Sequence, residues 1–268
     1  MDGRNIIGSN RYTTSNHSLF DGIELGRTEI YDASKQNCWP FCKAIDVRNG
    51  ITLSLGNLCK GYSFALNGHI FRTSEAAYLC GEFSDTPSKQ SIQYSLMEEP
   101  NAFLAKKVIK RKNIEYVRED WVEVRLQWML YVVWQKCIGN SNFRNLLLSI
   151  PNDVVIIEDS TANYGSTSSV WGAKNKELRN VRRALKKELI AHNPTMRKKD
   201  LNLLISKECG KITNVGSFVG ENNMGKILMM CKIALWNNIV PPIDYELLRA
   251  KKIYLFGELL TFDGEDRL

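Results

Sequence analysis

A run of three successive helical segments in the middle of the chain most strongly constrains the fold. The segments cover residues 100–112, 119–137 and 142–150. The first begins with Pro100 and turns basic toward its end, and the third stops before Pro151. The predicted strands are few and do not alternate regularly with helices, which argues against a doubly wound parallel sheet. The sequence therefore predicts an α+β, mostly helical single domain with a small sheet or hairpin.

The clearest strand signal is a β-hairpin over residues 62–72. Apolar residues alternate on both sides of Asn67-Gly68, a dipeptide that suits a tight type I′ turn. A short helix over 73–83 follows, capped by Thr73 or Ser74 and carrying Glu75 in its first turn. The other predicted elements are strands at 51–55 and 154–159, basic helices at 177–191 and 198–208, a last main helix at 222–236, and an edge strand within 252–262.

The chain is expected to have two parts of unequal character. Residues 1–50 are polar and weakly periodic, which predicts a loop-rich N-terminal extension with at most one short strand. Residues 51–268 would form the folded domain, with a basic helical insertion at about 174–215. The chain has 268 residues, of which 44% are hydrophobic, and this is enough to bury one sizeable core.

Composition narrows the class of protein. The sequence has no apolar run of 18 residues and no secretion signal at its start, so we expect neither a membrane span nor export. The seven cysteines are odd in number and scattered, which indicates reduced thiols in a cytoplasmic protein. Cys38 and Cys42 lack a matching second pair of ligands, and the three histidines are isolated. No metal and no cofactor are therefore expected.

The basic character of the protein is concentrated in one segment. The net charge is +7, and residues 174–211 contain 12 Lys or Arg against 4 Asp or Glu. Such a patch suits a polyanion such as a DNA or RNA strand. The candidate nucleic-acid contacts are Arg182, Arg183, Lys186 and Lys187. The alternative is a solvated helical hairpin that keeps the protein soluble.

The stretch GENNMGKILMM at residues 220–230 resembles a nucleotide-binding P-loop. Gly220, Gly225 and Lys226 give the spacing G-x-x-x-x-G-K, but Ile227 stands where Mg²⁺ needs a hydroxyl ligand. The acid-bearing strand VVIIED also precedes the glycines rather than following them. We therefore predict no nucleotide hydrolysis, although free N–H groups at the start of this helix could still hold an anion.

The order and spacing of several motifs resemble the NADAR (YbiA-like) family of N-glycosidases. The similarity covers about residues 51–236. The matching runs are LGNL, FALNGHIFRTSEAAYLCGEF, SIQYSLMEEPNAFLAKKV, REDWVEVRLQWM, VVIIEDS, WGA and GENNMGKILM. The runs SIQ and EDS resemble the branch that removes ADP-ribose from guanine in DNA more than the riboflavin-pathway branch.

The resemblance implies a set of site residues. Glu75 and Asp120 would be catalytic. The residues implied in substrate binding are Asn57, Tyr78, Arg118, Trp121, Arg125, Glu158, Trp171, Gly172, Asn222 and Asn223. Two positions depart from the family pattern: Ser168 replaces an Asp, and Glu82 replaces a Lys or Arg. These departures put catalysis in doubt.

The chemistry of N-glycosidic cleavage suits these residue types. The transition state carries positive charge on the ribose ring, which a carboxylate such as Glu75 can stabilise. Arg118 and Arg125 could grip a phosphate, and Trp121 and Trp171 could stack on a base. Most of the implied site residues also have a purely structural alternative. Glu75 and Asp120 would be acids in the first turn of a helix, and Asn57 would be a turn residue. Glu158 would be the internal partner of an arginine, and the tryptophans would pack in the core.

Three functions follow as hypotheses. The first is removal of ADP-ribose from a guanine-type base in nucleic acid. The second is cleavage of a free ribosylated metabolite of the riboflavin-pathway type. The third is a non-catalytic module that binds ADP-ribose or a nucleotide. The sequence sets no oligomeric state.

Overall fold

The computed structural model describes residues 17–42, 47–163 and 168–262, and the chain divides into two compact units. Unit 1 comprises residues 1–22, 60–148 and 230–268, and unit 2 comprises 23–59 and 149–229. Within the described ranges, no helix combines the length and the hydropathy that crossing a bilayer requires. The expected loop-rich extension falls partly on residues 1–16 and 43–46, which lie outside the described ranges.

Unit 1 is mainly helical and is built around one long helix. Its elements are η1 (His17–Phe20), β5 (Phe64–Leu66), β6 (His69–Phe71), α1 (Ser74–Gly81), η2 (Pro87–Lys89), α2 (Gln90–Glu98), α3 (Ala102–Leu104), the π-helical η3 (Ala105–Ile109), α4 (Lys110–Lys112), η4 (Ile114–Tyr116), α5 (Trp121–Gly139), α6 (Ser141–Ser149), α11 (Tyr245–Ala250), β9 (Tyr254–Leu255) and β10 (Glu258–Leu259). The helix α10 (Asn223–Asn237) begins in residues assigned to unit 2 and ends in residues assigned to unit 1.

Helix α5 forms the core of unit 1, and α1 packs directly on it. Trp128, Tyr131 and Trp134 of α5 are fully buried. The close approach of α1 requires a glycine, because a Cβ at Gly81 would lie 2.1 Å from Trp128 Nε1. The same indole nitrogen donates a hydrogen bond to Ala77 O at 3.3 Å. This packing fixes the orientation of α1 and of the carboxylates that it carries.

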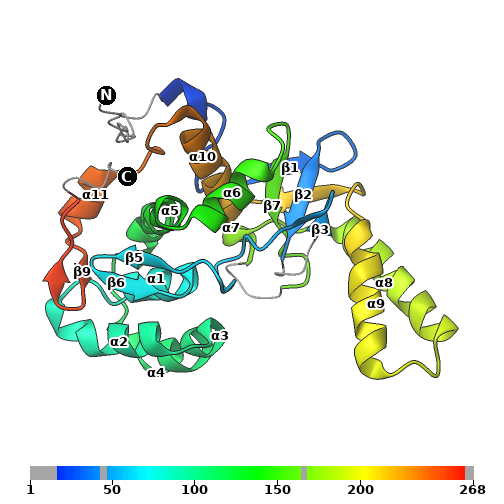
Figure 1. The fold of residues 1–268 in the computed structure, drawn as a ribbon, viewed down its shortest axis with the longest axis horizontal. Coiled ribbons are helices and arrows are strands. Elements are labelled where there is room, and N and C mark those ends of the chain that lie inside the picture. The colour runs from blue at the N-terminus through cyan, green and yellow to red at the C-terminus, as the bar shows by residue number, and fades with distance from the viewer. Residues whose placement is uncertain (1–16, 43–46, 164–167, 263–268) are drawn as a thin grey trace, which may run out of the picture. The chain divides into compact units, whose positions relative to one another are not determined.

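Unit 2 contains small two-stranded sheets flanked by helices (Figure 1). Its elements are β1 (Glu29–Asp32), β2 (Cys38–Phe41), β3 (Val47–Arg48), β4 (Ile51–Thr52), β7 (Val155–Glu158), α7 (Ser168–Trp171), α8 (Lys176–His192), α9 (Lys198–Lys211) and β8 (Ser217–Gly220). The strands pair β2 with β7 in parallel, and β1 with β8 and β3 with β4 in antiparallel fashion. Tyr31, Ile157, Leu178 and Phe218 belong to one buried apolar cluster beneath them.

The α+β expectation is confirmed, as is the hairpin. Asn67 and Gly68 have φ angles of 48° and 74°, which are the two left-handed positions of a type I′ turn. The basic insertion forms the antiparallel pair α8 and α9 close to the predicted bounds.

Several element predictions differ from the structure. The strand expected at 51–55 extends only over β4, and the expected C-terminal edge strand is a β9–β10 hairpin. The first fifty residues contain β1, β2 and β3, where at most one strand was expected. Helices α2 and α11 were not predicted as elements, because both segments are short, with nine and six residues.

Candidate functional site

The P-loop-like glycines serve close packing in unit 2. A Cβ at Gly220 would lie 2.5 Å from Gly172 O, and one at Gly225 would lie 2.1 Å from Ile156 O. Both positions therefore exclude a side chain because of neighbouring backbone, with no nucleotide involved.

Lys226 completes the P-loop-like spacing, but it is a buried structural lysine. Only 1% of its side chain is exposed. Its Nζ donates to Glu24 O at 2.7 Å and Arg27 O at 2.8 Å, and it lies 2.9 Å from Glu29 Oε1. The ammonium thus ties the loop before β1 to α10 within unit 2, and the prediction against a P-loop agrees with this geometry.

Asn222 and Asn223, expected to contact substrate, are fully buried and hydrogen-bonded to the protein. Asn222 Oδ1 accepts from Glu158 N at 3.0 Å, and its Nδ2 donates to Ile156 O at 2.9 Å. Asn223 Nδ2 donates to Val170 O and to Glu221 Oε2, and its Oδ1 accepts from Gly26 N. Their side chains hold β7 and the neighbouring loops together.

In unit 1, Glu75 is a buried carboxylate with a lysine beside it. It occupies the first turn of α1, behind the N-cap Thr73, whose hydroxyl accepts a hydrogen bond from Ala76 N. The residue is 5% exposed, and its Oε1 lies 2.8 Å from Lys106 Nζ. The Lys106 side chain is 45% exposed. An accessible ammonium therefore accompanies a carboxylate that is withdrawn from water.

Glu82, the C-cap residue of α1, repeats this arrangement two turns after Glu75. It is 1% exposed, and its Oε1 lies 2.6 Å from Lys110 Nζ, while its Oε2 is buried without a hydrogen-bond partner among the described residues. Burial raises the pKa of Glu82; Lys110 opposes that rise, and the nearby charge of Glu75 adds to it. The two acids and the two lysines thus form a carboxylate–lysine cluster, defined as Glu75, Glu82, Lys106 and Lys110.

Aromatic and cationic side chains lie beside this cluster. Tyr78 projects from α1 between the two acids in sequence, and its ring lies 5.1 Å from that of Trp121 at the start of α5. Burial and the charges of Glu82 and Glu75 raise the pKa of Tyr78, and Arg125 counteracts them. The Nε of Arg125 is buried and has no hydrogen-bond partner among the described residues. These predicted residues are therefore brought together in unit 1 with Glu75.

Arg118 and Asp120 form a separate, internally satisfied group. Arg118 is 3% exposed; its Nε donates to Asp120 Oδ1 at 2.5 Å, and its other nitrogens donate to Ser84 Oγ and Lys251 O. The hydrogen bond from Arg118 is the main reason that the pKa of Asp120 is lowered. This arrangement clamps the chain before α5 to the segment after α11.

The remaining predicted residues lie in unit 2. Asn57 Nδ2 donates to Met224 Sδ at 3.4 Å. Gly172 is buried, and a Cβ there would lie 2.3 Å from Glu158 O. Trp171 ends α7 and is half-buried. Ser168, one of the two departures, begins α7, although residues 164–167 of the preceding loop lie outside the described ranges.

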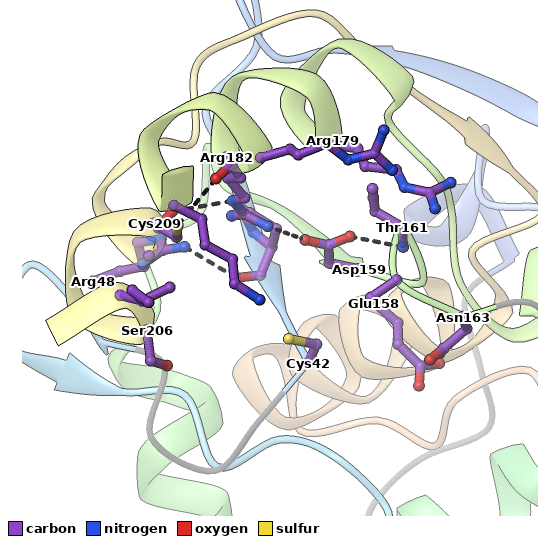
Figure 2. Close-up of a pocket in the computed structure, with 16 residues that line it drawn as sticks. Cys42, Arg48, Glu158, Asp159, Thr161, Asn163, Arg179, Arg182, Ser206 and Cys209 are labelled. Carbon is purple, nitrogen blue, oxygen red and sulfur yellow. Dashed lines mark hydrogen bonds and ion pairs between the residues drawn. The ribbon is translucent and has the colours of Figure 1, made fainter. Parts of the chain in front are cut away.

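The insertion forms a pocket of about 560 Å³ within unit 2 (Figure 2). Its wall includes Glu158 and Asp159 at the end of β7. Arg182 is a strut inside it, since its guanidinium contacts Asp159 Oδ2 at 2.7 Å, Cys209 O at 3.0 Å and Ile212 O at 3.1 Å. The other candidate nucleic-acid contacts are all exposed; Arg183 and Lys186 line the pocket, whereas Lys187 is not part of its wall.

Sequence reasoning missed Lys106, Lys110 and the pocket. The two lysines are spaced four residues apart in the segment 106–112, which contains five basic residues and fits a solvated helix face equally well. Within the part of the chain that the structure describes, no three His, Cys, Asp or Glu side chains gather in a way that could hold a metal ion.

Comparison with known proteins finds a similarity among solved structures. No family model matches the chain, and no curated protein matches it. Among solved structures, it is similar to the NMR structure of the E. coli protein YbiA, at 17% sequence identity and a TM-score of 0.46. The similarity covers 76% of this chain and 92% of that one.

Proposed function

We propose that the protein is an N-glycosidase that hydrolyses the bond between ribose and a base nitrogen, and that it removes ADP-ribose from a guanine-type base in nucleic acid. The proposal is supported chiefly by Glu75, a buried carboxylate 2.8 Å from the half-exposed ammonium of Lys106. The sequence resemblance to N-glycosidases supplies the reaction class.

The chemistry assigned to Glu75 is electrostatic. As the C–N bond breaks, positive charge develops on the ribose ring, and a carboxylate withdrawn from water stabilises that charge more strongly than one in bulk solvent. Water then adds to the anomeric carbon, and the base leaves with the electron pair of the broken bond and takes up a proton. In this scheme Tyr78, Trp121 and Arg125 contact the nucleoside part of the substrate.

Lys106 and Lys110 bear on the departure from the family pattern at Glu82. The family pattern has a Lys or Arg where this chain has Glu82, but Lys110 brings an ammonium to 2.6 Å from that acid. Lys106 does the same for Glu75. The cluster therefore provides cations from a different segment, which favours catalysis over a purely binding role.

Asp120 receives a positioning role in this scheme. Its pKa is lowered and its oxygens are engaged by Arg118. Such a carboxylate is a poor proton donor, so we assign it to holding the start of α5, where Trp121 lies.

The test is a product analysis by mass spectrometry. The purified protein is incubated with DNA that carries ADP-ribosylated guanine and, separately, with free ribosylated metabolites, each with and without EDTA. We expect free ADP-ribose from the DNA, at a rate that EDTA does not change. Cleavage of the free metabolites alone would overturn the substrate class, and no cleavage of either would overturn the enzymatic proposal.

Glu75→Gln tests the assigned residue, because it removes the charge and keeps the shape. We expect turnover to fall by about 10²–10³ with substrate binding retained, the scale for loss of one electrostatic stabiliser. Glu98→Gln, at an exposed position of α2, makes the same charge change and should leave turnover unaltered. Near-normal turnover by Glu75→Gln would remove Glu75 from its role.

A further inference from the structure

The pocket of unit 2 concentrates positive charge in a concave site. Its wall carries five cationic side chains against two carboxylates. The cations are Arg48, Arg179, Arg182, Arg183 and Lys186. Like charges repel one another more strongly in a recess than on an open surface, because less water screens them. A site of this composition is therefore best satisfied by an anion.

Helix α8 presents these cations in a regular way. Positions 179, 182, 183 and 186 are spaced by three and four residues, so they share one helix face. All four line the pocket, whereas Lys187, the next residue, does not. The charge of the insertion is thus divided between a face that lines the pocket and the rest of the helix surface.

Two of the cations are held in place by the protein. Arg182 is the strut to Asp159 described above, and that pair neutralises one acid of the wall. Arg48 donates to Val47 O at 2.8 Å and to Pro40 O at 3.4 Å. Fixed guanidinium groups lose little conformational freedom on binding, which favours recognition of an anion.

Polar groups that suit a hydroxylated ligand line another part of the wall. Glu158 and Asn163 lie near one another below Thr161, and the thiol of Cys42 lies across the pocket from them (Figure 2). A carboxylate and an amide can accept and donate hydrogen bonds to a sugar. The volume of about 560 Å³ lies within the usual range for small-molecule and cofactor sites.

We propose that this pocket binds a phosphate-bearing nucleotide, with its phosphate groups against Arg183 and Lys186 and its sugar toward Glu158. The cationic side chains of the wall outnumber its carboxylates by three, which is more than one carboxylate ligand would balance, whereas a diphosphate carries enough charge to match that excess. Two sources supply this chemistry: a free nucleoside diphosphate and the phosphorylated end of a nucleic-acid strand. The proposal concerns binding and stands independently of N-glycosidase activity.

Calorimetric titration of the full chain tests the proposal. The probes are ADP, adenosine, and a short single-stranded oligonucleotide with and without a 5′-phosphate. We expect ADP to bind and adenosine not to bind. If the phosphorylated oligonucleotide also binds and competes with ADP, the strand end is a ligand; if it does not, the free nucleotide is. Binding of neither ADP nor the phosphorylated strand would overturn the proposal.

Adjacent residues of α8 provide a matched pair of variants. The double variant Arg183→Gln/Lys186→Gln removes two charges from the wall, and Lys176→Gln/Lys187→Gln removes two from the same helix outside it. We expect at least about tenfold weaker ADP binding in the first, and less than about twofold in the second. Equal weakening in both would mean diffuse attraction to the insertion and would overturn the pocket.

Cysteine labelling gives a readout that needs no variant. Cys42 is the exposed cysteine among the seven and lines the pocket. Bound ADP should slow alkylation of Cys42, measured by mass spectrometry, and adenosine should not. ADP binding that leaves the Cys42 rate unchanged would place the nucleotide elsewhere and overturn the proposal.

Discussion

Replacing Lys226 with methionine should destabilise unit 2 severely. The substitution keeps most of the apolar stem and removes the ammonium, which has three oxygen partners: Glu24 O, Arg27 O and Glu29 Oε1. The side chain is 1% exposed, so water cannot easily replace the lost donor. Removing one member of a buried ion pair typically costs about 3–5 kcal/mol. Because a typical domain is stable by about 5–15 kcal/mol, that loss would be a large fraction of the total.

The assay is urea denaturation of the parent and the variant, monitored by tryptophan fluorescence and by hydrogen exchange of residues 23–32. We expect a lower midpoint with a similar slope, and faster exchange in the loop that Lys226 holds. Lys35→Met is the control, because Lys35 is paired with Asp32 but 80% exposed, and such surface pairs contribute little. A loss below about 1 kcal/mol for Lys226→Met would refute the assignment of this lysine as a structural tie.

Three further predictions follow from the packing and the charges. Gly225→Ala should cost about 3 kcal/mol or more in thermal or urea unfolding, because its Cβ would lie 2.1 Å from Ile156 O. Gly68→Ala should cost only about 1–2 kcal/mol in the same measurement, since open space surrounds it and the strain of a φ of 74° remains. Glu82→Gln should stabilise the protein more at pH 8 than at pH 4. Because the pKa of Glu82 is raised in the folded state, the folded parent binds this proton more tightly than the unfolded parent does. The parent therefore loses stability as the pH rises through and above the unfolded pKa, and the variant does not. A pH-independent effect of Glu82→Gln in urea titrations would contradict the burial argument.

Local chemistry explains which elements the sequence could predict. The Asn67-Gly68 dipeptide fixes its own turn because few other residues accept two successive left-handed conformations. The helices of the insertion were predictable because their helical sequence pattern extends over 17 and 14 residues. Neither depends on a distant partner.

Elements that depend on distant partners were missed. β2 consists of four residues that include Pro40, and it is a strand because it pairs with β7 more than a hundred residues later. Likewise, the partners of Lys226 are two backbone carbonyls and one carboxylate some 200 residues away, which no local pattern reveals.

In the candidate site, too, some residues could be predicted from the sequence, and others depend on distant partners. The resemblance pointed to Glu75, Tyr78, Trp121 and Arg125, which come together in unit 1. Lys106 escaped notice because its contact with Glu75 depends on how the segment after α2 folds back beside α1. Arg182 was expected at a nucleic-acid surface, but its partners Asp159, Cys209 and Ile212 converge only once α8 and α9 have packed.

The pairing of β1 with β8 has a consequence for the protein during its synthesis. Asp32 meets Ser217 only after about 185 further residues have been added, which takes roughly 10–40 s at 5–20 residues per second. During that interval the nascent β1 has no strand partner from β8, and the aromatic ring of Tyr31 lacks the cover of Phe218. Residues 60–148, which all belong to unit 1, emerge from the ribosome in the meantime. The β1–β8 sheet of unit 2 can therefore form only late in synthesis, and unit 1, whose residues 230–268 follow β8, is completed later still. A chaperone that shields short unpaired strands would thus have β1 as a substrate for most of the time that the chain takes to emerge.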